Sequence, residues 1–219
     1  QAAEEGVTAA LITPDRMLTR QVTAALDRWN ILPDDSAGTP LQLSPPGRFL
    51  RHVSTLFQHD LTAEALLTLL KHPLCHSGHD RGEHLRATRE LELHIRNKSW
   101  PYPRPELIRA WGVAAEMESW ANWVADSFCQ PPRRGKRALS DWIEDHIARA
   151  EAIAAGPQGE DSELWKEAAG RKARAVVEGL RDEAGFGTDL DARDYGDLFA
   201  AILQQHELRD RDAPHPRIL

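Results

Sequence analysis

The sequence predicts a mainly α-helical protein: a helical bundle with a short strand at each end, contributed by an incomplete α/β domain. Apolar residues recur every three or four positions through most of the 219 residues, and breaks rich in proline and glycine separate these segments. Strand-like patterns occur only near the two ends, and we expect none between about residues 50 and 213. This order is typical of a helical insertion into a sheet domain.

The first element is a short apolar run over residues 7–13, which predicts a buried strand. Thr13 can cap a following helix, Pro14 suits its first position, and Asp15 favours its positive end. The helix carries an apolar stripe of Leu18, Val22, Leu26 and Trp29. Residues 30–46 contain many prolines, glycines and aspartates and predict a loop with a short extended piece around 41–43.

Seven further helices follow from apolar spacing and capping residues. The first two begin after Ser44 and after Thr62, the third covers 82–97, and the fourth, which is the longest, runs over about 105–128. The fifth begins at a Ser140 cap, the sixth spans Leu164 to Leu180, and the seventh begins near Asp191. The last four residues resemble the start of a strand. We therefore predict a strand-turn-helix and loop over 1–45, a helical domain over 46–213, and a return strand over 214–219.

Composition limits the function classes. With 41% hydrophobic and 28% charged residues the chain has an ordinary soluble composition, and its net charge of −7 argues against a surface that is basic all over. No apolar run approaches the length that crosses a bilayer. Two cysteines cannot form a disulfide-rich scaffold or ligate an iron–sulfur cluster. We expect a cytoplasmic protein with no membrane partner.

One histidine-rich and cysteine-containing segment offers residue types that bind zinc. Its candidate ligands are Cys75, His76, His79 and His84. Their spacing matches no standard ligand pair, and the middle of the segment is glycine-rich. A solvated loop with chance histidines is the favoured interpretation, and we predict no metal here.

One dense basic run is a candidate for phosphate contacts. It contains Arg133, Arg134, Lys136 and Arg137. Guanidinium and ammonium groups suit a DNA backbone, but a solvated loop between helices explains the run equally well.

Seven tryptophans are many for this length, and four of them lie between residues 100 and 123. Packing between helices is the favoured interpretation, ahead of base stacking or a partner surface. The sequence lacks a phosphate-binding loop, a nucleophile elbow and a paired-histidine zinc motif, and no lysine has an acidic residue two positions before it. We therefore expect no catalytic apparatus in this chain.

Several segments resemble the AddB-type subunits of bacterial AddA–AddB helicase–nucleases, which repair double-strand breaks. The most specific are ALITPDRMLTR at 10–20 and HPRIL at 215–219; others lie at 26–31, 34–41, 46–50, 69–75 and 194–199. The resemblance implies a 2B-like helical insertion of a superfamily 1 helicase-like subunit, with residues 1–45 and 214–219 belonging to its 2A sheet domain.

The resemblance also implies a function. The chain would be a non-catalytic part of a DNA-repair subunit that scaffolds contacts to DNA ends and to an AddA-type partner during ATP-dependent end processing for homologous recombination, near the nucleoid. ATP, magnesium and the iron–sulfur cluster would belong to other parts of the subunit, with no cofactor here. Candidate contacts to DNA or the motor core are Thr13, Asp15, Arg16, Arg20, Asp35 and Ser36. Two alternatives remain open: a helical protein-interaction adaptor that uses the tryptophan-rich helix, and a metal-dependent enzyme.

Overall fold

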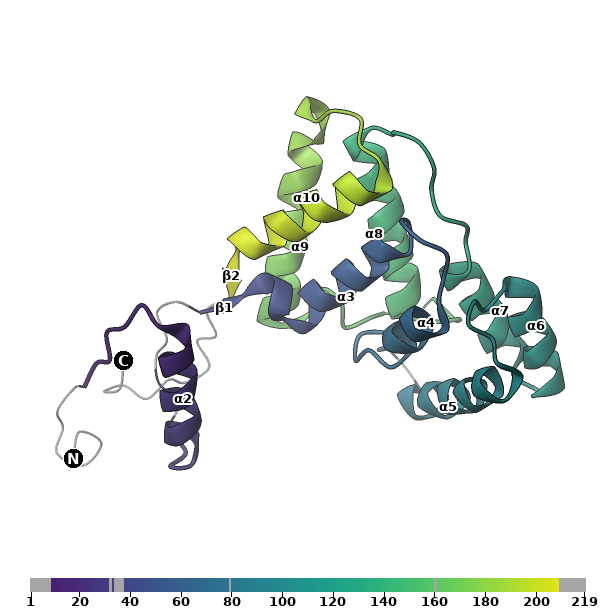
Figure 1. Ribbon diagram of the computed structural model, residues 1–219, viewed down its shortest axis with the longest axis horizontal. Coiled ribbons are helices and arrows are strands. Elements are labelled where there is room, and N and C mark those ends of the chain that lie inside the picture. The colour runs from purple at the N-terminus through teal and green to yellow at the C-terminus, as the bar shows by residue number, and fades with distance from the viewer. Residues whose placement is uncertain (1–8, 32, 34–37, 79, 160, 209–219) are drawn as a thin grey trace. The chain divides into compact units, whose positions relative to one another are not determined.

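The computed structural model describes residues 9–31, 33, 38–78, 80–159 and 161–208, and it confirms the mainly helical fold (Figure 1). Its α-helices are α2 (Arg16–Asp27), α3 (Pro45–Thr55), α4 (Ala63–Leu70), α5 (Arg81–Lys98), α6 (Pro105–Ala114), α7 (Glu118–Phe128), α8 (Leu139–Ala155), α9 (Glu167–Glu183) and α10 (Ala192–Gln205). Two 3-10 helices, η1 (Leu41–Leu43) and η2 (Ala184–Phe186), and two strands, β1 (Thr39–Pro40) and β2 (Glu207–Leu208), complete the described part.

The chain divides into two units. The terminal unit consists of residues 1–39 and 207–219, and the helical unit consists of residues 40–206. The polypeptide therefore passes between the units twice. At these crossings β1 pairs with β2, and the backbone N–H of Leu41 donates to the carbonyl of His206 at 2.8 Å. The chain thus enters and leaves the helical unit at adjacent points, while the predicted boundaries at 45 and 213 stay a prediction.

The strand predictions need correction. Strand β2 falls inside the region where no strand was expected, and residues 41–43 form a 3-10 turn instead of an extended piece. In the described part of the predicted first strand, only Ala9 forms a bridge, and Leu11 and Ile12 are exposed. An apolar run becomes a buried strand only where a neighbouring strand completes its backbone hydrogen bonds. The return strand at 214–219 lies outside the described residues.

Several helices begin at a residue whose side chain caps the first turn. Ser44, Thr62 and Asp191 are the N-caps of α3, α4 and α10, as predicted, and each side chain accepts backbone N–H groups of the first turn. The cap of α2 is Asp15 and not Thr13, whose hydroxyl instead accepts from the backbone N–H of Asp15. Ser140 lies inside α8, so its predicted role as a cap was wrong.

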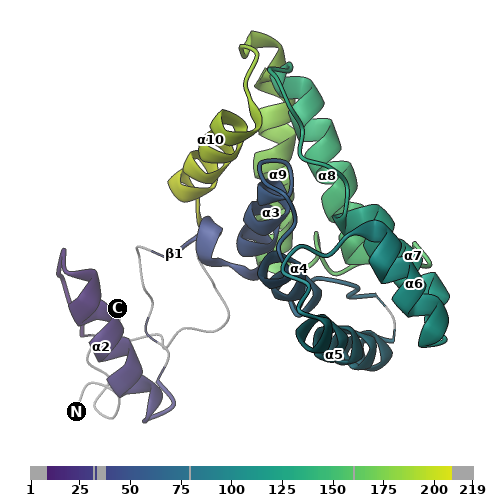
Figure 2. The same cartoon turned by 45° about the vertical axis from the view of Figure 1, so that its right-hand side comes forward.

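The predicted helix over 105–128 is two helices. Helix α6 ends at Ala114, Glu116 adopts a left-handed backbone with φ of 58°, and α7 begins at Glu118. The two helices then pack against each other (Figures 1 and 2), so closely that Gly112 has no room for a side chain beside Ala121. Similarly, α9 starts only at Glu167, after the two apolar residues predicted to belong to it, Leu164 and Trp165.

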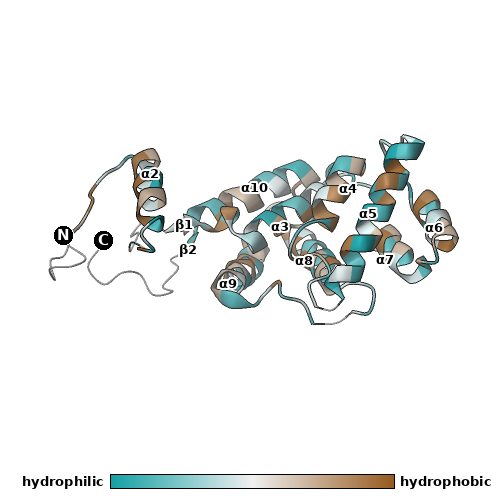
Figure 3. Ribbon diagram, turned by 90° about the horizontal axis from the view of Figure 1, so that it is seen from below, coloured by the Kyte–Doolittle hydropathy of each residue, from teal (hydrophilic) through white to brown (hydrophobic). Residues whose placement is uncertain are grey.

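The core of the helical unit forms where α3 contacts α8, α9 and α10. Figure 3 shows hydrophobic and hydrophilic residues on the same helices, as amphipathic helices require. The largest fully buried side chains include Phe49, Phe57, Trp142, Tyr195 and Phe199. In the described residues, no helix combines the length and hydropathy needed to cross a membrane.

Candidate functional site

The candidates near the N-terminus occupy the start of α2. The carboxylate of Asp15 accepts the backbone N–H of Met17 at 2.8 Å, and Arg20 is exposed one turn further on. Thr13 is half-buried, and Arg16 is the first residue of α2. Asp35 and Ser36 lie outside the described residues. Because Asp15 already neutralises the positive end of this helix, the helix start is a weak site for phosphate.

The basic run forms the connection between α7 and α8. Arg133 and Arg137 both pair with Asp145 of α8, at 3.4 Å and 2.7 Å, and the guanidinium carbon of Arg137 lies 5.0 Å from the ring centroid of Trp142. A backbone bridge between Arg137 and Leu190 fixes the end of the connection. Two of the four cations are therefore structural.

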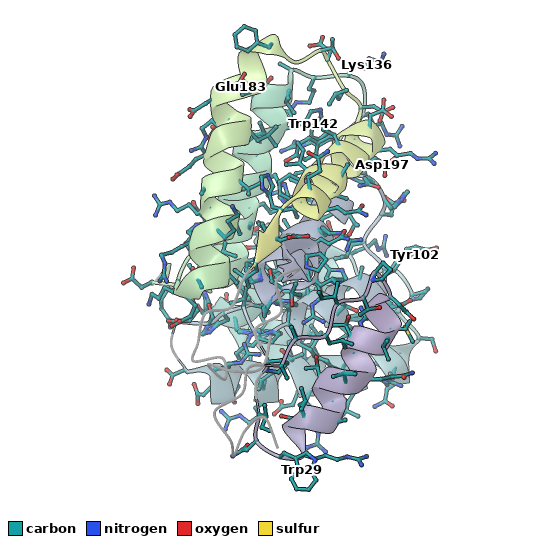
Figure 4. All side chains as sticks on the ribbon, turned by 90° about the vertical axis from the view of Figure 1, so that its left-hand side faces the viewer. Trp29, Tyr102, Lys136, Trp142, Glu183 and Asp197 are labelled. Atoms are coloured by element: carbon teal, nitrogen blue, oxygen red, sulfur yellow. The ribbon has the colours of Figure 1, made fainter. Side chains whose placement is uncertain are left out.

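The other two cations of the basic run are exposed and could contact a phosphate. Arg134 and Lys136 are exposed, flank Gly135, and make no hydrogen bond or ion pair with the described residues. Figure 4 shows Lys136 at the same end of the helical unit as Glu183, while Trp142 lies inside. An exposed cation without a carboxylate partner is the kind of group that can neutralise a phosphate.

A second basic region was missed by the sequence analysis. Arg48 and Arg51 lie one helical turn apart on the exposed side of α3, and Arg81 at the start of α5 donates to the carbonyls of His72 and Cys75. Burial, followed by the charges of His52, Arg48 and Arg81, lowers the pKa of His72 to about 4. Arg81 comes from a different helix than Arg48 and Arg51, so no dense run marks the three cations in the sequence. The spacing of Arg48 and Arg51 on a helix was the only available signal.

Beneath the basic run lies a buried polar network. His146 is fully buried; one ring nitrogen, Nδ1, lies 2.7 Å from the Tyr195 hydroxyl, and the other, Nε2, lies 2.9 Å from the Leu50 carbonyl. Burial lowers the pKa of His146 to about 4 and raises that of Tyr195. His146 is therefore neutral, with Nε2–H donating to the carbonyl and Nδ1 accepting from the tyrosine. This arrangement satisfies every polar atom of the ring and indicates a structural role.

The described residues of the histidine-rich segment include buried side chains that pack inside the helical unit. Cys75 is buried and burial raises its pKa, so its thiolate is strongly disfavoured. The rings of His76 and His84 stack with centroids 5.1 Å apart. His79 lies outside the described residues. No group of three or more histidine, cysteine or acidic side chains in the described part has a metal-binding arrangement.

His84 is also fully engaged. Its Nε2 lies 2.7 Å from the Leu70 carbonyl, and the indole N–H of Trp120 donates to its Nδ1 at 3.1 Å. Burial lowers its pKa to about 4. By contrast, Nδ1 of His76 is buried without a hydrogen-bond partner among the described residues. Two rings predicted as chance histidines of a solvated loop therefore lie in a packed aromatic cluster.

The tryptophans mostly support packing. Trp111, Trp120, Trp123 and Trp142 are buried, which confirms the core interpretation for these four. Trp29, just after α2, is 77% exposed.

None of the protein-family models, curated proteins or solved structures compared with this chain matches it.

Proposed function

We propose that the helical unit is a non-catalytic module of an AddB-like DNA-repair subunit, inserted into a helicase-like sheet domain and contacting DNA ends and an AddA-type partner. The supporting observation is the pair of adjacent crossings, where Leu41 hydrogen-bonds to His206 and β1 pairs with β2. An inserted domain needs entry and exit points that lie close together, because the host fold has to continue across the insertion.

DNA contact in this proposal is electrostatic. Arg134 and Lys136 are the cations of the basic run that make no ion pair with the described residues, and Arg48 and Arg51 supply a second exposed pair. Such contacts hold the sugar–phosphate backbone without reading sequence. We assign no bond-making step to this chain, and ATP, magnesium and an iron–sulfur cluster belong in the proposal to other parts of the subunit.

The test is DNA binding by the whole chain, measured by fluorescence anisotropy of a labelled duplex with a single-stranded overhang. We expect weak binding whose affinity falls steeply with salt, with a slope of about −0.9 per neutralised phosphate on the duplex. Arg134→Gln/Lys136→Gln should make that slope shallower by about two contacts. The matched control is Arg171→Gln/Lys172→Gln, which removes two exposed cations of α9.

Two results would refute the DNA contact. One is binding that does not depend on salt, and the other is an equal effect of the control and test variants. Circular dichroism of each variant separates lost contacts from lost fold.

The adaptor alternative depended on an exposed, tryptophan-rich long helix. That helix is split into α6 and α7. The side chains of Trp111, Trp120 and Trp123 are buried, with only 7% to 9% of their surface exposed. These rings are occupied by packing, so no observation favours that version of the adaptor.

A further inference from the structure

Helix α4 lies between α3 and α5 and contacts both of them (Figure 2). The turn that follows α4 carries His72, whose ring centroid lies 5.2 Å from that of Phe49 and 6.5 Å from that of His52, both on α3. Arg81, at the start of α5, donates to the carbonyls of His72 and Cys75 at 3.2 Å and 2.8 Å. Side chains of three separate segments therefore meet at this turn.

The side chains that meet here are basic. We call them the α3–α5 cluster, which consists of Arg48, Arg51, His52, His72 and Arg81. Burial is the first cause that lowers the pKa of each histidine, and the positive charges of the cluster are the others. Arg48 acts on both rings, so the cluster is close enough for its members to influence one another. Such a concentration of positive charge attracts an anion.

The carboxylates nearest to the cluster in the chain do not face it. Glu92 of α5 pairs with Lys71 at 2.6 Å and with Arg96 at 2.7 Å. Asp80 and Glu83 line a hollow that they share with residues 116–120, and no member of the cluster lines that hollow. The positive charge of the cluster is therefore left for a ligand to balance.

Both histidine rings of the cluster have nitrogens that a ligand can reach. Nδ1 of His72 accepts the backbone N–H of Leu74 at 3.2 Å. Because its pKa is about 4, the ring is neutral at pH 7 and carries its proton on Nε2. This Nε2–H makes no hydrogen bond with the described residues, and neither it nor a ring nitrogen of His52 is a buried polar atom without a partner. The Nε2–H of His72 is thus an accessible donor.

The arginines supply both a fixed and an open contact. Two backbone carbonyls hold the guanidinium of Arg81, which leaves the rest of its five N–H groups for a ligand. Arg48 and Arg51 are exposed and make no hydrogen bond or ion pair with the described residues. Donors from α3, from the turn after α4 and from α5 can therefore converge on one anion.

This convergence suits a phosphate monoester better than a phosphodiester. A monoester carries a charge of about −1.5 to −2 at pH 7 and presents three strong acceptor oxygens. Each phosphodiester of a duplex carries a single negative charge and belongs to an evenly spaced row. Hydrogen bonds from arginine to phosphate are among the strongest that proteins make, and they act at short range.

The surroundings of the cluster favour a nucleic acid as the carrier of that phosphate. The backbone N–H of Arg133, in the basic run, donates to the carbonyl of Phe57 just beyond the end of α3, at 3.0 Å. Arg48 and the last residue of α3 are about 10 Å apart along the helix axis, which is about three base-pair steps of a duplex. A partner that contacts both basic regions needs repeated phosphates, which a DNA strand has and a singly phosphorylated peptide lacks.

We propose that the α3–α5 cluster binds the terminal phosphate of a DNA strand. The phosphate is held between Arg48 and Arg81 and accepts the Nε2–H of His72. The inference rests on the proposed DNA role and deepens it, because it names a chemical group by which a DNA end differs from the interior of a duplex.

The test uses the whole chain at pH 7.5 and three blunt duplexes of one sequence with an internal fluorescent label. One duplex has 5′-phosphates, one has 3′-phosphates, and one has only hydroxyl ends. We expect fluorescence anisotropy to show binding about tenfold tighter for a duplex with a terminal phosphate than for the hydroxyl duplex. The phosphorylated duplex that binds more tightly identifies the strand end.

A pair of variants locates the preference. Arg48→Gln should reduce it from about tenfold to about twofold, because one of the two guanidinium groups on the phosphate is lost. Arg171→Gln removes an exposed cation of α9 and should leave the preference unchanged. The preference is a ratio of two affinities of the same variant, so a partly unfolded sample lowers both affinities and does not imitate the loss.

A second measurement reports on the cluster without DNA. Inorganic phosphate is titrated into the protein at constant ionic strength, and the ring resonances of histidine are followed in ¹H–¹³C NMR spectra. We expect saturable shifts for His52 and His72 and none for His146, which is fully buried. Unchanged signals of His52 and His72 would contradict the inference.

The inference is also overturned if all three duplexes bind equally, if Arg48→Gln keeps the full preference, or if a phosphoserine peptide binds more tightly than either phosphorylated duplex. Equal, salt-dependent binding of the three duplexes refutes only this inference and leaves the proposed function standing. Absence of binding to every duplex refutes both, so the two failures are distinguishable.

Discussion

Removing the hydroxyl of Tyr195 tests the buried network directly. The Tyr195→Phe substitution deletes the donor that lies 2.7 Å from Nδ1 of His146 and leaves the rest of the ring in place. The stacking of this ring on Trp142, with centroids 5.5 Å apart, needs no hydroxyl. The change therefore isolates one hydrogen bond from the apolar packing around it.

The expected cost follows from burial. His146 and Tyr195 are both completely buried, so water cannot replace the lost donor. Leaving a buried acceptor unpaired costs about 1–3 kcal/mol, and for a chain of this size each kcal/mol lowers Tm by about 2–4 °C. The slope of the unfolding free energy with urea should not change, because the surface exposed on unfolding stays the same.

Urea unfolding at pH 7.5, followed by far-ultraviolet circular dichroism, measures this cost. Tyr102→Phe is the matched control, because Tyr102 is 59% exposed and makes no hydrogen bond with the described residues. Its unfolding free energy should equal that of the wild type. An unfolding free energy of Tyr195→Phe that also equals the wild-type value would refute the assigned network.

Three other predictions concern stability and reactivity. Burial lowers the pKa of His146 from 6.5 to about 4, so the unfolded chain takes up a proton that the folded protein refuses. The contribution of His146 to the free energy of unfolding is fully present above pH 6.5, and up to about 3 kcal/mol of it is lost as the pH drops from 6.5 to 4. Urea midpoints that stay constant between pH 7 and pH 5 would contradict this. Gly112→Ala should destabilise the protein by about 1–3 kcal/mol because its methyl group meets α7, whereas Gly179→Ala, with open space around it, should stabilise α9 by up to about 1 kcal/mol; equal Tm shifts would disprove the close helix contact. Cys75, which is buried, and Cys129, which is half-buried, should react with a disulfide reagent far more slowly in the folded protein than in urea, since burial raises the pKa of Cys129 to about 12 and that of Cys75 further; fast reaction of both thiols at pH 7.5 without urea would refute this protection.

Much of the helical fold could be predicted because its signals are local. Ser44 and Thr62 cap their helices through hydrogen bonds to residues three positions ahead, and Asp191 does the same over two and three positions. Apolar stripes placed Phe49 and Tyr195 on faces that are buried. These features depend on neighbours within one helical turn, which a single sequence displays.

The candidate sites could be predicted only in part. The basic run was visible as a dense cluster, but Asp145 of α8 decides that Arg133 and Arg137 are structural. The hollow of the helical unit that is lined by Asp80, Glu83, Glu116 and Glu118 was not visible at all, because these carboxylates come from separated segments. A scan for dense runs or fixed ligand spacings cannot detect such a gathering.

The sequence alone determined the fold class, the helix starts at Ser44, Thr62 and Asp191, and many of the buried apolar faces, because these follow from backbone geometry and burial within short segments. Tertiary structure decided where the helix predicted over about 105–128 breaks, since Gly112 packs against Ala121 where α6 folds back onto α7. It also decided that His76 and His84 stack in an aromatic cluster and that the two crossings near residues 40 and 206 lie together. These outcomes depend on contacts between residues far apart in the chain, whose free energy no local pattern contains.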